Sequence, residues 1–118
     1  MKLTVFCALL AFIAYTASPL AFAEQKGAMI YGAGISSCGK WTRDKTHDRE
    51  AYYQNAQWVL GFLSALNKND SVVGAKPAKQ IDADGRMAFI DQYCSKNPLD
   101  SISNAALSLY MNLKGWRK

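Results

Sequence analysis

Apolar residues recur every three or four positions in three stretches of this chain, and that spacing is typical of one face of a helix. The longest stretch predicts a helix from Asp48 to about Asn67, with a capping carboxylate at its start and an asparagine at its stop. Gly61 and Ala65 lie four positions apart, and we expect this strip of small residues to let another helix approach closely. The apolar face of this helix comprises Tyr52, Ala56, Val59, Leu63 and Leu66, with Phe62 beside them.

Two shorter amphipathic helices are predicted after the long one. The first opens at Asp82 or Asp84, because carboxylates accept the free N–H groups of a first turn, and it runs to about Ser95. The second is capped by Asp100 or Ser101. Their apolar faces comprise Met87, Phe89, Ile90, Tyr93 and Cys94 in one helix and Ile102, Ala106, Leu109 and Leu113 in the other.

A short helix is predicted before the long one. Ser36 or Ser37 can cap it, and it carries Cys38 and Trp41. The residues before it, 24–36, mix glycines with isolated apolar residues and show no long period, so we expect an irregular lead-in with room for one short helical or extended piece.

Two polar segments separate the predicted helices. Residues 42–48 are expected to form a surface connection. Residues 67–81 contain glycine and proline and are expected to form a loop, whose length is typical of a mobile or functional segment. No convincing strand remains. The predicted fold is therefore all-α, a small bundle of three to four amphipathic helices with one disulfide.

The first 23 residues have the three parts of a secretory signal peptide. Lys2 gives a positive start, an apolar run extends to Ala17, and small residues around Ala23 mark the expected cleavage site. The apolar run of about 15 residues is short for a membrane span, which needs roughly 20. We therefore predict a periplasmic or secreted protein with residues 24–118 as one domain and no membrane span after cleavage. An uncleaved membrane anchor is the alternative.

The cysteine count gains meaning once the signal peptide is removed. Cys7 leaves with it, so the mature chain keeps an even pair, Cys38 and Cys94. In an oxidising compartment such a pair is most simply a disulfide, and two free thiols binding a metal are the alternative. Closing this loop stabilises the fold by about 4 kcal/mol in the chain-entropy model. No further metal ligands lie nearby in sequence, so we expect the disulfide and neither metal nor cofactor.

Charge and motifs exclude several function classes. The chain has 14 Lys and Arg and 9 Asp and Glu, but its basic residues are scattered, which does not indicate nucleic-acid binding. Residues 34–40 match a phosphate-binding loop except that Trp41 stands where Ser or Thr should hold magnesium. Residues 82–85 lack the remaining ligands of a calcium loop. His47 is the single histidine, and we predict no catalytic site.

The aromatic residues are candidates for a protein-binding surface. Most are expected in the core, because aromatic side chains bury large areas. Some can instead anchor a partner protein. The candidates are Tyr31, Trp41, Trp58, Phe62 and Trp116.

The layout resembles the periplasmic acid-stress chaperones HdeA and HdeB and their wider family over about residues 36–112. Three features carry the resemblance: a cysteine at the start of the first helix (Cys38), the sequence WVLGFLSALN at 58–67, and the sequence YCSKNP at 93–98. The resemblance implies a small helical periplasmic protein that is dimeric at neutral pH, loosens in acid and binds unfolding clients. In acid the carboxylates neutralise while the positive side chains remain, so self-repulsion would loosen the fold.

A second family has a similar plan, namely the Tai-type immunity proteins of the type VI secretion system. Their Cys-x-Gly-Tyr-x-x-Gly helix is loosely similar to Trp58 and Gly61 here. This resemblance implies a small exported inhibitor that occludes a toxin, with residues 67–81 as the protruding loop. Chaperone-like protein binding is therefore the first functional hypothesis, and inhibition of a secreted toxin or enzyme is the alternative.

Overall fold

Residues 27–116 are described by the computed structural model, in which they form one short 3-10 helix and four α-helices. The 3-10 helix η1 comprises Gly32–Ile35, α1 Cys38–His47, α2 Arg49–Val72, α3 Ala83–Lys96 and α4 Ile102–Leu113. The described part contains no strand, only one isolated bridge between Ser37 and Ser101. The all-α fold class is confirmed, whereas the predicted signal peptide lies outside the described residues.

Each α-helix begins where a side chain accepts a hydrogen bond from the first turn. Ser37 accepts from the backbone N–H of Lys40, Asp48 from Ala51, Asp82 from Gly85 and Ser101 from Asn104. These four caps satisfy N–H groups that have no partner within the helix. They confirm the helix starts expected from the sequence.

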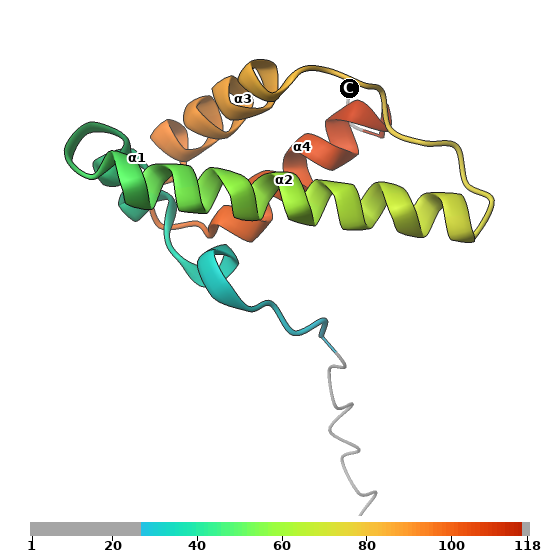
Figure 1. Cartoon of the computed structure of the whole chain (residues 1–118), viewed down its shortest axis with the longest axis horizontal. Coiled ribbons are helices and arrows are strands. Elements are labelled where there is room, and N and C mark those ends of the chain that lie inside the picture. Colours follow the sequence, from blue (N-terminus) through green and yellow to red (C-terminus); the bar gives the residue numbers. More distant parts are fainter. Residues whose placement is uncertain (1–26, 117–118) are drawn as a thin grey trace, which may run out of the picture.

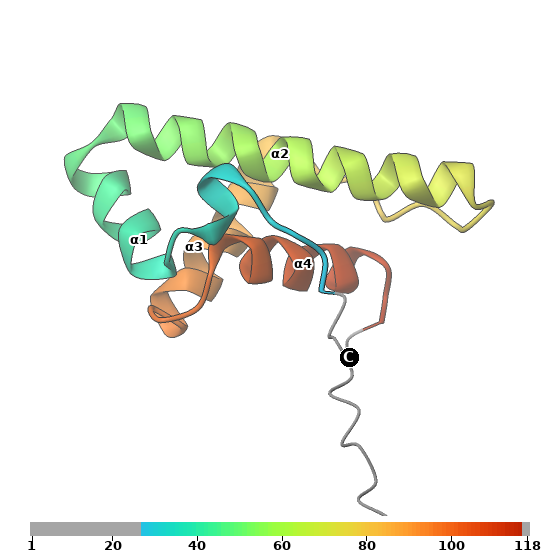
Figure 2. The ribbon, with the colours of Figure 1, turned by 90° about the horizontal axis from the view of Figure 1, so that it is seen from below.

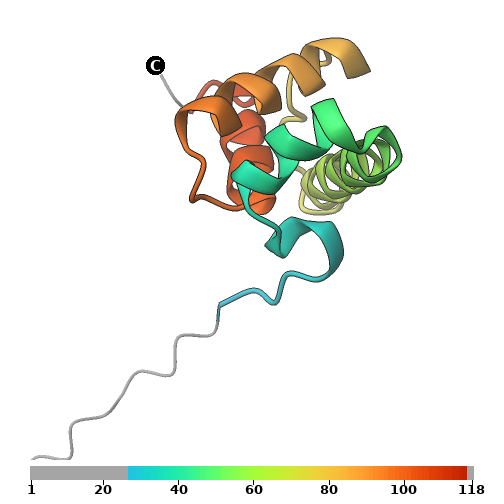
Figure 3. The same ribbon diagram turned by 90° about the vertical axis from the view of Figure 1, so that its left-hand side faces the viewer.

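The helices pack so that α2 covers one side of the other three. Figure 1 shows α2 running the length of the fold, and Figure 2 shows α1, α3 and α4 together on one side of it. The 3-10 helix η1 packs against α2 and α4, and Figure 3 shows it next to α2, which is seen nearly end-on. The largest fully buried side chains come from all four helices and are Trp41, Ile90, Ile102, Leu109 and Val59. The predicted apolar faces therefore meet in one core.

The Cys38–Cys94 disulfide joins α1 to α3 across 56 residues of sequence, with Cα atoms 4.6 Å apart. Both cysteines are fully buried. Next to them, the backbone N–H of Cys38 donates to the carbonyl of Asp100 (2.7 Å), and that of Ile102 donates to Ser36 (2.9 Å). The start of α1 is therefore fixed to both α3 and α4.

Two connections are shorter than the sequence predicted. Residues 42–48 were expected to be a surface connection, but α1 continues to His47, because Asp44 turns inward and its carboxylate is hydrogen-bonded. The long helix does not stop at Asn67 but continues to Val72, because Asp70 is buried against α4. The loop therefore begins at Val73.

The expected close approach of a helix at Gly61 and Ala65 is also wrong. Both residues are exposed, and a Cβ atom added to Gly61 would meet nothing within 4 Å. The close backbone approach occurs instead at Gly34 in η1, where an added Cβ would lie 2.2 Å from the ring of Trp58. Only glycine allows η1 to pack on this tryptophan.

Candidate functional site

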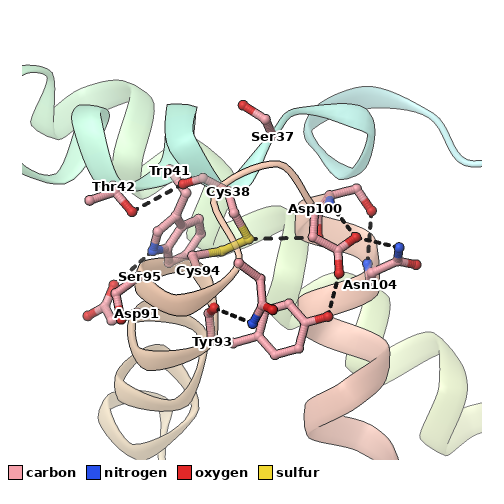
Figure 4. The surroundings of a disulfide bond; sticks show 12 residues. Ser37, Cys38, Trp41, Thr42, Asp91, Tyr93, Cys94, Ser95, Asp100 and Asn104 are labelled. Carbon is pink, nitrogen blue, oxygen red and sulfur yellow. Dashed lines mark hydrogen bonds between the residues drawn. A yellow bond between two sulfur atoms is a disulfide. The ribbon is translucent and has the colours of Figure 1, made fainter.

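Asp91 on α3 is hydrogen-bonded to two other helices. Its carboxylate accepts from the indole Nε1 of Trp41 on α1 at 2.8 Å, pairs with Lys45 on α1, and accepts from the hydroxyl of Tyr52 on α2 at 3.5 Å. Figure 4 shows Trp41 and Asp91 beside the disulfide. Burial, together with the negative charge of Asp91, raises the pKa of Tyr52 to about 12. One carboxylate thus holds three helices together.

Asp44 joins α1 to α2 from a fully buried position. Its carboxylate accepts from Asn55 on α2 at 3.2 Å and from Arg43 at 3.1 Å, and it also pairs with Lys40. Burial alone would raise the pKa of Asp44, but the hydrogen bonds and positive charges of Lys40 and Arg43 outweigh it, so the pKa lies below its usual value. Asp44 is therefore charged at neutral pH.

Asp70 joins α2 to α4. It accepts from the hydroxyl of Tyr110 at 2.5 Å and from Nζ of Lys114 at 2.9 Å. The hydrogen bond from Tyr110, followed by that from Lys114, lowers the pKa of Asp70. Burial and the same hydrogen bond raise the pKa of Tyr110 to about 12. Lys114 also donates to the carbonyl of Lys76, so this cluster fixes the loop after α2 as well.

Asp100 joins α3 to the start of α4, close to the disulfide (Figure 4). It accepts from the hydroxyl of Tyr93 at 2.5 Å, from Nδ2 of Asn104 at 2.6 Å and from the backbone N–H of Ser101 at 2.8 Å. These bonds, that of Tyr93 first, lower the pKa of Asp100. Together, Asp44, Asp70, Asp91 and Asp100 are called the aspartate links below.

An apolar surface lies where η1 packs on α2. The ring of Trp58 stacks on that of Phe62, with centroids 5.1 Å apart, and its indole N–H donates to the carbonyl of Tyr31 at 2.9 Å. Met29, Tyr31 and Ile35 on the same segment are exposed. We call these five residues the η1 surface. Such exposed apolar groups mark a protein-interaction surface when they gather.

The structure brings three of the five predicted partner-binding residues together. Tyr31, Trp58 and Phe62 belong to the η1 surface. Trp41 is fully buried between α1 and α3, so its prediction as a surface residue is corrected: it belongs to the core. Trp116 is 63% exposed but packs against Tyr110 and Lys114 at the end of α4.

A groove of about 710 Å³ lies between the end of α4 and the loop after α2, and we call it the α4 groove. None of its lining residues is acidic. Lys79 holds the two walls together, because its backbone N–H donates to the carbonyl of Leu113 at 2.9 Å. The lining residues are Ala75, Lys76, Pro77, Lys79, Asn112, Leu113, Lys114, Gly115 and Trp116.

The turn between α3 and α4 presents one apolar side chain. Leu99 is 97% exposed. Its neighbours are fixed, because the carbonyl of Pro98 accepts from Gly39 at 2.8 Å and the N–H of Asp100 donates to Asn97 at 3.1 Å. No spacing in the sequence distinguishes this residue from a buried leucine.

The described residues show no group of three or more His, Cys, Asp or Glu side chains that could hold a metal ion. His47 lies at the exposed end of α1, where its Nδ1 contacts Thr46 and the carbonyl of Arg43. Asp82 caps α3. Among residues 27–116, no helix is both long and apolar enough to cross a membrane.

Comparison of the chain with protein-family models, with curated proteins and with solved structures finds no match.

Proposed function

We propose that this protein is an exported, non-enzymatic protein-binding domain that loosens in acid and then holds unfolding proteins. The resemblance to the HdeA and HdeB chaperones motivates this function, and the aspartate links are the observation that supports it most. Asp44 joins α1 to α2, Asp91 joins α3 to α1 and α2, Asp70 joins α2 to α4, and Asp100 joins α3 to α4. Protonation in acid weakens the links of Asp44, Asp70 and Asp100, whose carboxyl pKa values lie below the usual value in the folded protein.

Loosening of the links would expose the surface that binds clients. The helices that the aspartates join bury their apolar faces against one another, and Trp41, Ile90 and Leu109 are among the fully buried side chains. Acid also removes negative charge from a chain that already carries a formal net charge of +5, so repulsion adds to the loosening. The buried disulfide keeps α1 attached to α3. The opened state therefore remains a partly ordered apolar surface.

The direct test is light scattering of a client protein that denatures and aggregates at about pH 2.5, with and without the purified, disulfide-bonded protein. We expect an equimolar amount to suppress aggregation at this pH and to have little effect on a heat-denatured client at neutral pH. Equal suppression by a small helical protein of matched charge, or no suppression, would contradict the proposal.

The alternative function, neutralisation of a toxin or enzyme, draws its support from Leu99. An exposed apolar side chain on a fixed turn can enter a partner's pocket without the entropic cost of ordering the loop. The fixed hydrogen bonds of Pro98 and Asp100 give Leu99 this rigidity.

The two functions differ in the pH at which they act. An inhibitor should capture one stoichiometric partner at neutral pH from a neighbouring strain, and Leu99→Asp should abolish that capture while leaving acid chaperone activity intact. Capture that is unchanged in Leu99→Asp, or no partner at neutral pH, would count against inhibition.

A further inference from the structure

The α4 groove presents positive charge that the fold itself does not neutralise. Lys76 and Lys79 are exposed on its wall, and neither forms an ion pair with any residue in 27–116. Lys114 differs, because its Nζ is buried and already paired with Asp70. The groove therefore offers two free ammonium groups and no carboxylate.

Apolar surface lies beside these lysines. Trp116 is 63% exposed, while Lys114 lies 5.0 Å from its ring centroid and Tyr110 packs against it edge-on. Tyr110 and Lys114 are both hydrogen-bonded to Asp70, so the side chains that contact the ring of Trp116 are held in place. Pro77 and Leu113 add further apolar lining. The lining of the groove thus combines apolar side chains with two cationic ones.

We propose that the α4 groove docks an acidic peptide segment of a partner protein, with carboxylates on Lys76 and Lys79 and an apolar side chain against Trp116 and Pro77. This inference rests on the proposed protein-binding function and assigns it a site that works in the folded, neutral-pH state. A volume of about 710 Å³ lies in the range of ligand pockets and holds a few residues of an extended peptide.

An acidic peptide can contact both the lysines and the apolar side chains of the groove, whereas other anions contact only the lysines. Inorganic phosphate would engage the lysines alone and leave Trp116, Pro77 and Leu113 without a contact. An anionic polysaccharide supplies repeated charge but no apolar side chain of the size of leucine. Peptides that combine both groups match the two chemistries of this surface, because charge complementarity directs docking while apolar contact at a held aromatic ring supplies affinity.

The test is an NMR titration of the ¹⁵N-labelled, disulfide-bonded protein at neutral pH with the synthetic peptide Asp-Glu-Leu-Asp-Glu-Leu. We expect saturable shifts of the Trp116 indole and of the Lys76 and Lys79 amides. Lys76→Glu combined with Lys79→Glu should weaken binding at least about tenfold, because each attractive contact becomes repulsive. Both substitutions leave the backbone hydrogen bonds of the loop in place, so an unchanged melting temperature verifies the fold.

A matched control variant changes the same charge elsewhere. Lys68 and Lys96 are exposed and lie outside the groove, so Lys68→Glu combined with Lys96→Glu should bind the peptide within about twofold of the original protein. Equal loss in this variant would overturn the proposal, since general charge would then explain binding. Equal binding of Asn-Gln-Leu-Asn-Gln-Leu, stronger binding of an oligoglucuronate, or no binding at all would also overturn it.

The outcome separates this site from the proposed chaperone function. Peptide binding is measured at neutral pH in the folded protein, whereas client protection is measured in acid. If the protein protects clients in acid but does not bind the peptide at neutral pH, the proposed groove site is wrong and the chaperone function is retained. If the protein binds the peptide but does not protect clients, the chaperone function is wrong and the groove site is retained.

Discussion

The indole N–H of Trp41 donates to the carboxylate of Asp91 at 2.8 Å, so the largest buried side chain of α1 is satisfied by a single acid on α3. The same carboxylate also pairs with Lys45 and accepts from Tyr52. Trp41 has no exposed surface, so water cannot replace this bond unless the helices separate. The state of one carboxyl group therefore affects the packing of three helices.

Removing Asp91 should destabilise the fold more than neutralising it. Asp91→Ala leaves the buried indole N–H without an acceptor and should lower the free energy of unfolding by about 2 kcal/mol, whereas Asp91→Asn keeps an acceptor and should lower it by about 1 kcal/mol. Urea unfolding at neutral pH measures both. The exposed Asp84→Asn is the control, and an Asp91→Ala variant as stable as this control would contradict the account.

Stability should fall in acid. The pKa values of Asp44, Asp70 and Asp100 lie below 3.8 in the folded protein, so the unfolded chain binds more protons as the pH drops. The stabilisation is complete above about pH 5 and is lost as the pH falls through 3.8 toward the folded pKa values. Urea unfolding at a series of pH values measures this profile. Asp44→Asn should flatten it, and a level profile down to about pH 2 in the original protein would refute the prediction.

The alkaline limit of stability should depend on the phenols of Tyr52 and Tyr110. The pKa values of Tyr52 and Tyr110 are raised to about 12, so the unfolded chain loses these protons first and stability falls between pH 10 and 12. Ultraviolet absorbance of tyrosinate should show Tyr52 and Tyr110 as late-titrating groups, and Tyr110→Phe should remove one of them. The exposed Tyr31→Phe should keep both, and a single early titration of all tyrosines would rule out this assignment.

Two glycine substitutions should act in opposite directions. Gly34→Ala places a Cβ 2.2 Å from the ring of Trp58, so η1 must separate from α2 and the indole resonance of Trp58 should shift. Gly61→Ala has open space within α2 and should raise the free energy of unfolding by about 0.5–1 kcal/mol. Thermal unfolding measures both, and a neutral Gly34→Ala would show that the contact contributes little.

The apolar periodicity predicted the helices because each apolar face turned out to be buried. Val59 and Leu63 pack in the core and Tyr52 packs against it, as their spacing required, and Ser37 and Asp82 cap helices as expected. The disulfide followed from an even cysteine count. The local sequence pattern was therefore sufficient to predict a helix wherever one apolar face of that helix is buried.

The aspartate links could not be found in this way, because a buried aspartate has the same local sequence as a solvated one. Asp44 and Asp70 lie in stretches that are polar on average, so the sequence placed them in connections. Their burial depends in part on partners on other helices, Asn55 for Asp44 and Tyr110 for Asp70, which local sequence does not reveal. Trp41 was misplaced for the same reason, since its acceptor lies 50 residues away.

One pH titration that follows two signals in parallel tests most directly whether loosening of the fold in acid activates client binding. The near-ultraviolet circular dichroism of the protein reports the packing of its tryptophans, and the difference between the original protein and Trp41→Phe gives the part due to Trp41. Light scattering reports aggregation of a client. We expect client protection to begin over the same range of pH in which the tryptophan signal is lost, and we expect Asp44→Asn and Asp91→Asn to shift both signals to higher pH together. Protection that is equally strong while the tryptophan signal is intact, or its absence after that signal is lost, would contradict this expectation.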